Sequence, residues 1–197
     1  MSTGQWMHPT DGTPWFLEAG SESLDFAYTG ELGRPATSGE RLLSPHDLGT
    51  WLAEHIGRID PADAGDRDLA DALILRDTIA RLYLATVDRT QADADDIDTL
   101  NLFAATPDVP PALDGGRRQA GAARIRIAQT LSTLARDAVA RLSDDTDRIR
   151  RCAADDCDLV FVDESRTGSR RWCSMQRCGN RAKVRAHRAR IAARAAG

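Results

Sequence analysis

The spacing of the four cysteines is the feature that most constrains this chain. All four lie in the last quarter of the sequence, in two close pairs, Cys152-x4-Cys157 and Cys173-x4-Cys178, with fifteen residues between them. Two short cysteine pairs on either side of a hairpin-sized gap are typical of a tetrahedral zinc site, because each pair can turn two sulfurs toward one point. The spacing therefore predicts Zn²⁺ bound by Cys152, Cys157, Cys173 and Cys178.

Two disulfides, or four unrelated core cysteines, are the alternatives to zinc. The N-terminal stretch MSTGQWMHPTDGTPW has neither the basic segment nor the apolar run of a signal peptide. No apolar run is long enough to span a bilayer, so we expect no membrane partner and a cytoplasmic location. Disulfides are rare there, and the symmetric spacing argues against unrelated cysteines. Zinc is the preferred interpretation.

The residues between the two cysteine pairs also favour a small metal-dependent module. Residues 159–162 (LVFV) are β-prone, residues 163–169 (DESRTGS) are turn-rich, and Arg170-Arg171-Trp172 returns to Cys173. We expect a treble-clef-like finger over residues 149–197, with a knuckle, a β-hairpin and a basic C-terminal helix. The metal would replace the hydrophobic core that a module of this size cannot build.

The rest of the chain predicts helices. Aromatic residues make up 5% of the sequence, and apolar residues recur at helical spacing. Residues 1–19 look like an irregular lead-in, and residues 20–148 are predicted to form an acidic multi-helical domain, which makes the fold mainly α. Helices are expected at about 21–29, 44–57, 66–87, 95–105 and 125–142, although the alternating ARIRIA of residues 123–128 leaves a strand open there. The predicted core includes Leu73, Ile79, Leu84, Leu131 and Leu134.

Charge divides the chain in the same place. Residues 1–150 hold 15 Arg against 25 Asp and Glu, a balance of −10, whereas residues 151–197 hold 11 Lys and Arg against 5 acids, a balance of +6. From Ser165 to the end there are 10 basic residues and no acidic one. A split of this kind predicts that the basic part binds an anion, either nucleic acid or the acidic domain of the same chain.

The basic residues near the C-terminus follow a helical repeat. Arg177, Arg181, Arg185 and Arg188 are spaced by four, four and three residues and would form one stripe, which suits a phosphate backbone. A solvated charged face, or a stripe docked on the acidic domain, are the alternatives. Val184, His187 and Ile191 lie on another face that could pack on the finger or the helical domain. The predicted nucleic-acid contacts are Arg170, Arg171, Arg177, Arg181, Lys183, Arg185 and Arg188.

Three residues after the last cysteine are expected to support the zinc ligands. Gly179 would allow a tight backbone whose amides point at the sulfur. Asn180 could cap the helix or bond back across the knuckle. Arg181 could hold one of the nearby acids, Asp155, Asp156 or Asp163, as an alternative to contacting nucleic acid.

These residues resemble a known family. The run from Cys152 and Cys157 through Phe161, Asp163 and Ser165 to RWCSMxxCGNRxK (Arg171 to Lys183) is similar to the CGNR zinc finger. In that family the finger follows an all-helical domain described as a stress-induced transcription regulator. SLDFAYT (Ser23 to Thr29) lies where the family has an LDLVNT-like stretch, with Tyr28 in place of the usual Asn. The resemblance implies a zinc-binding transcription regulator.

We therefore expect a transcriptional regulator that binds DNA through the finger and the basic helix, with RNA as a further option. The helical domain would sense a signal or assemble the protein. The alternative is a structural interaction protein whose finger staples its own domain or a partner. The scattered histidines and the absence of nucleotide-binding or nucleophile motifs favour a protein that is not an enzyme. The small-molecule ligand of the helical domain, and whether the chain forms a homo-oligomer, are left open.

Overall fold

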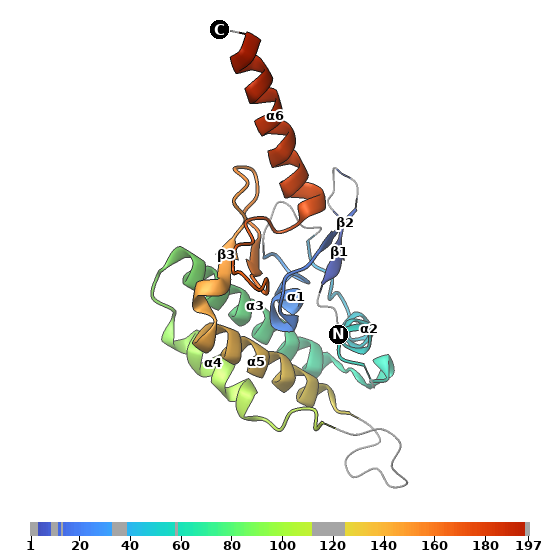
Figure 1. Ribbon diagram of the computed structural model, residues 1–197. Coiled ribbons are helices and arrows are strands. Elements are labelled where there is room, and N and C mark those ends of the chain that lie inside the picture. The colour runs from blue at the N-terminus through green and yellow to red at the C-terminus, as the bar shows by residue number, and fades with distance from the viewer. Residues whose placement is uncertain are drawn as a thin grey trace.

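The computed structural model describes residues 4–8, 12, 14–32, 39–57, 59–111 and 125–195. Five helices form the body of the molecule, and a sixth extends from its top (Figure 1). The helices are α1 (Glu22–Ala27), α2 (Pro45–His55), α3 (Asp66–Asp88), α4 (Ala94–Ala105), α5 (Ile127–Asp144) and α6 (Asn180–Ala195). The strands are β1 (Gln5–Met7), β2 (Trp15–Leu17), β3 (Ile149–Arg151) and β4 (Val160–Val162). The mainly α fold with a small cysteine-containing module is as the sequence predicts.

Helix α3 is the centre of the helical domain. It contacts α1, α2, α4 and α5 on the domain side, and β3 and β4 of the finger. One hydrophobic core runs through all of these elements, from the helices to the strands beside the cysteines. In the described part of the chain, no helix is long and apolar enough to cross a membrane.

The helix boundaries follow from local chemistry. Ser44 caps α2 by accepting a hydrogen bond from the Asp47 amide, and Pro45 occupies the first turn, as the sequence indicates. Gly57, with φ +76°, ends the same segment in a left-handed conformation that suits glycine. Helix α5 begins at Ile127, so the helical alternative holds there; residues 123 and 124 of the alternating stretch lie outside the described residues.

The lead-in was expected to be irregular, but it contains two strands. Strands β1 and β2 form an antiparallel pair in which Trp6 lies opposite Phe16. Trp15 and Leu17 are buried in the common core. Their side chains alternate with the half-buried Phe16, as expected for a strand. A strand of three residues is too short for this alternation to be recognised from the sequence.

The buried face of α3 is rotated from the predicted one. Ile79, Leu131 and Leu134 are core residues, as predicted, but Leu73 and Leu84 are only partly buried at the edge of the core. The face that is buried instead is Ala72, Leu75, Arg76, Thr78, Ile79, Leu82 and Tyr83. The sequence pattern was ambiguous because apolar residues occur at most positions of this helix.

Two ionisable residues lie inside the helical domain. The Arg76 guanidinium is paired with Glu40 at 2.7 Å and with Asp77 at 2.9 Å. Asp25 is buried, and neither of its carboxylate oxygens has a hydrogen-bond partner among the described residues. Burial raises the pKa of Asp25 to about 8, so this carboxyl is largely protonated at neutral pH.

The position of the core predicts a large difference between two isoleucines on α3. Ile79 is fully buried, whereas Ile74 is 54% exposed. Ile79→Ala should lower the free energy of unfolding by about 2–5 kcal/mol because it leaves a cavity. Ile74→Ala makes the same chemical change on the same helix and should alter it by no more than about 0.5 kcal/mol. Urea denaturation measures both; equal effects would contradict the described packing.

Candidate metal centre and basic helix

The first cysteine pair lies in the connection of a hairpin. Strand β3 pairs antiparallel with β4, with Arg150 opposite Phe161, and Cys152 and Cys157 lie between the two strands. The Cys152 amide donates to the Leu159 carbonyl at 2.8 Å, which continues the ladder. The predicted strand at 160–162 is confirmed. Its partner is β3 rather than the expected segment 170–172, which is not a strand.

The second cysteine pair lies at the base of α6. Cys173 precedes a short π-helical turn, Met175–Gly179, which contains Cys178 and leads directly into the helix. The Ala153 amide donates to the Arg171 carbonyl at 2.9 Å, and this bond holds the two cysteine segments together. π-turns often occur at functional sites because they redirect the chain by one extra residue.

The four sulfurs meet at one point. The Sγ atoms of Cys157 and Cys173 are 3.7 Å apart, as are those of Cys173 and Cys178. All four Sγ atoms lie within 4.8 Å of one another, and all four residues are buried with free thiols. Four sulfurs at about 2.3 Å from a tetrahedral ion would be about 3.8 Å apart. The donor set and its size therefore fit a four-cysteine metal site.

Hydrogen bonds favour the thiolate form at Cys152 and Cys178, whereas hydrogen bonding with Cys152 raises the pKa of the Cys157 and Cys173 thiols. The Cys173 amide donates to Cys152 Sγ at 3.5 Å, and Arg181 Nη2 donates to Cys178 Sγ at 3.3 Å. The pKa of Cys178 is lowered, first by hydrogen bonding with Cys152 and the other thiols and further by the Arg181 guanidinium. Arg181 thus supports a ligand, as one of its predicted roles requires.

Asp163 organises the turn that follows β4. Its fully buried carboxylate accepts hydrogen bonds from the Ser165 amide at 2.9 Å, the Ser165 hydroxyl and the Arg170 amide at 2.8 Å. Burial acts to raise the pKa of Asp163, but these donors outweigh it and hold the pKa below its usual range. The turn-rich segment between the cysteine pairs is therefore held together by hydrogen bonds to one buried carboxylate.

The finger is joined to the rest of the molecule through β4. The Tyr28 hydroxyl lies 2.8 Å from both the amide and the carbonyl of Val160, donating to one and accepting from the other. On the other side, the Val162 amide donates to the Ala19 carbonyl at 2.7 Å. A Cβ on Gly20 would lie 2.4 Å from the Val162 carbonyl oxygen, so this approach requires glycine. The tyrosine in place of the family's Asn thus binds the finger directly.

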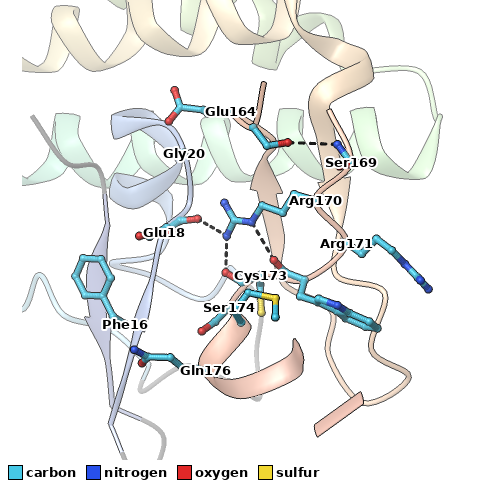
Figure 2. Close-up of a pocket in the computed structure, with 13 residues that line it drawn as sticks. Phe16, Glu18, Gly20, Glu164, Ser169, Arg170, Arg171, Cys173, Ser174 and Gln176 are labelled. Carbon is cyan, nitrogen blue, oxygen red and sulfur yellow. Dashed lines mark hydrogen bonds between the residues drawn. The ribbon is translucent and has the colours of Figure 1, made fainter. Parts of the chain in front are cut away.

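Arg170 is a half-buried residue bonded within the protein, not an exposed cation of the kind expected for a nucleic-acid contact. Figure 2 shows its guanidinium reaching from the finger to the lead-in. It donates to the carbonyls of Trp172 at 2.9 Å, Glu18 at 2.7 Å and Cys173, and stacks 4.3 Å from the Phe161 ring centroid. The Nε and Nη2 donors of Arg170 are used in these bonds, so contacts within the protein hold this guanidinium in place. Its neighbour Arg171 is exposed, over the Trp172 ring.

Gly179 supports the turn in a way that differs from the expectation, whereas Asn180 makes a predicted bond. The Gly179 amide donates to the Ser174 carbonyl at 3.0 Å rather than to a sulfur. A Cβ on Gly179 would lie 2.7 Å from the sulfur of Met175, so this exposed side chain would have to move to admit a larger residue. The Asn180 amide group donates to the Gln176 carbonyl at 3.3 Å, which is the predicted bond back across the knuckle.

The predicted arginine stripe is divided between two environments. Arg177 is half-buried, 4.8 Å from the Trp15 ring centroid, a contact with the lead-in that sequence reasoning missed. Arg181 and Arg185 pair with Asp156 at 2.9 and 3.0 Å. Arg188 and Lys183 are exposed and pair with no described residue. Of the three acids proposed for Arg181, Asp156 is the partner.

Helix α6 projects away from the body of the molecule (Figure 1). Every residue from Lys183 to Arg194 is exposed. Val184 and Ile191, which were expected to pack, are 49% and 54% exposed. The ion pairs of α6 are made with Asp155 and Asp156 in the finger, so the described helix is not docked on the acidic helical domain.

Two family models match this chain. Residues 20–145 match the ABATE family, whose description is "Putative stress-induced transcription regulator". Residues 148–191 match the CGNR zinc finger. A search of curated proteins found no relative.

The geometry predicts different effects for the two neighbouring arginines. Arg170→Ala removes three charge-assisted hydrogen bonds at the junction of finger and lead-in, and should lower the free energy of unfolding by about 1.5–3 kcal/mol. Arg171→Ala removes an exposed cation over a ring, and should cost less than about 1 kcal/mol. Thermal and urea unfolding of both variants provide the measurement. If Arg171→Ala were the more destabilising, the assignment of Arg170 as the structural residue would be wrong.

Proposed function

The chain belongs to the ABATE family of transcription regulators, and from this we propose that it regulates transcription by binding nucleic acid through a zinc finger and the basic helix α6. The observation that carries the proposal is the projection of α6, whose cations are exposed from Lys183 onward while no acid follows Ser165. Clustered cations without counterions are the electrostatic footprint of phosphate binding.

The metal in this proposal is zinc. Four sulfur donors in a compact arrangement suit zinc, and the matched finger family is named for it. Four cysteines fill a tetrahedral shell and leave no position for substrate, so the role of the ion is structural and the protein is not an enzyme. Cys152, Cys157, Cys173 and Cys178 are the ligands.

The contacts to nucleic acid come from the residues that the fold leaves exposed. Arg171, Lys183, Arg185 and Arg188 remain from the predicted set, whereas Arg170 and Arg177 are occupied by contacts within the protein. Arg181, the seventh residue of that set, is bonded to Cys178 and Asp156. Arg185 is paired only with partly or fully exposed acids at the surface, and such pairs are weak enough to exchange for a phosphate.

The alternative function, in which the finger staples its own domain, fits the contacts between the finger and the helical domain. Through Tyr28 and Val160 the finger is bonded to the helical domain, and both share one core. This favours a finger whose folded body fixes the position of α6, while the helix itself contacts the partner. The helical domain then serves as the sensing or assembly part of the regulator.

Zinc content tests the metal proposal. The purified protein should contain one zinc per chain, and Cys178→Ser should lose it and unfold the segment after about residue 150, because metal binding supplies the folding free energy of such modules. Gln176→Ser places the same residue at an exposed site in the same turn and should keep the metal. Elemental analysis gives the result; a metal-free wild-type protein with a folded finger would refute the proposal.

Salt-dependent binding tests the nucleic-acid proposal. Arg185→Gln with Arg188→Gln should weaken binding to duplex DNA and flatten the slope of log affinity against log salt by about 1.8, which is about 0.9 for each lost phosphate contact. Arg67→Gln with Arg89→Gln removes the same charge from exposed positions in the helical domain and should leave the slope unchanged. Fluorescence anisotropy provides the measurement. Wild-type affinity weaker than about 1 mM at low salt would contradict the proposal.

A further inference from the structure

The cations of α6 form two stripes, not one. Successive residues of an α-helix are about 100° apart, so Arg181, Arg185 and Arg188 share one side, here called the first stripe. Lys183, Arg190 and Arg194 lie within roughly 40° of one another and roughly 165° from the centre of the first stripe. The regular helix over Asn180–Ala195 therefore places Lys183, one of the predicted nucleic-acid contacts, on the side opposite the first stripe.

The second stripe has no counterion in the part of the chain that the structure describes. Lys183, Arg190 and Arg194 are exposed and make no ion pair with any described residue. The two stripes are separated by uncharged faces on both sides of the helix. One of these faces carries the residues Ala182, Ala186, Ala189 and Ala193, and the other carries Val184, His187 and Ile191.

Opposed stripes are unsuited to a single flat anionic surface. A helix lying on a membrane, on one phosphate backbone or on an acidic protein face would turn half of these cations away from the partner. A ligand with phosphates on both sides of the helix would use both stripes. The major groove of B-form DNA is about 12 Å wide between its two backbones and admits an α-helix, whereas that of A-form RNA is too narrow for side chains to enter.

Resting on the proposed function, we propose that α6 lies lengthwise in the major groove of duplex DNA, with the first stripe on one phosphate backbone and the second stripe on the other. The projection of the helix from the body is consistent with this placement, because the groove must surround α6 on three sides (Figure 1). Arg185 exchanges its surface pair with Asp156 for a phosphate, and Arg181 remains with Cys178.

The test compares charge removal on each side of the helix. Arg190→Gln with Arg194→Gln should flatten the salt slope on duplex DNA by about 1.8, as much as Arg185→Gln with Arg188→Gln. The protein should also protect guanine N7, which lies in the major groove, from dimethyl sulfate. Circular dichroism and zinc content should be unchanged, since glutamine is a good helix former and neither pair includes a ligand.

The outcomes separate this inference from the function on which it rests. A slope that changes only for the first-stripe pair, or unprotected N7 atoms with normal affinity, would overturn the groove placement and leave DNA binding in place. Tighter binding to duplex RNA than to duplex DNA would also overturn it. No wild-type binding to any nucleic acid would defeat the proposed function itself.

Discussion

The convergence of four sulfurs at one point is the constraint on which the rest of this structure depends. Cys152 and Cys157 lie in a hairpin, and Cys173 and Cys178 lie at the base of α6, so the cluster sets where that helix starts and where it points. Little else could do so, because α6 contributes no buried residue to the core. A helix with no packed face needs a rigid base, and a metal site provides one without a large hydrophobic core.

The same region uses its arginines for two purposes, and burial distinguishes them. Arg170 and Arg177 approach the lead-in, where the carbonyl of Glu18 and the ring of Trp15 receive them. Arg181 is shared between a sulfur and Asp156. Beyond Arg185, which still pairs with Asp155 and Asp156, the helix leaves the protein, and its cations are exposed and pair with no described residue. In a run of arginines, the side chains at one end can therefore bond within the protein while those at the other end remain exposed.

The sequence predicts the parts of this protein that depend on local chemistry. The cysteine spacing indicated the four residues that the structure brings together, and the cap at Ser44 indicated the start of a helix, because both are short-range patterns. It did not give the burial of Arg170 or the rotated face of α3, which depend on segments far away in the chain. The Tyr28–Val160 bond joins residues 132 positions apart, and the unpartnered carboxyl of Asp25 shows only when its surroundings are known.

The basic helix can remain undocked from the acidic body because most of its length lies far from that body. A helix of 16 residues extends about 24 Å at 1.5 Å per residue, whereas charges are screened over about 8 Å at physiological ionic strength. The outer half of α6, with Arg188, Arg190 and Arg194, therefore lies about 12–21 Å from the start of the helix, which is roughly 1.5 to 2.5 screening lengths. There the −10 balance of residues 1–150 neither draws the helix back nor repels a phosphate strongly. Near the base this protection fails, and it is there that Asp155 and Asp156 pair with Arg185. Electrostatics thus favours contact with an anion toward the tip of the helix first, with the pairs at its base exchanged afterwards.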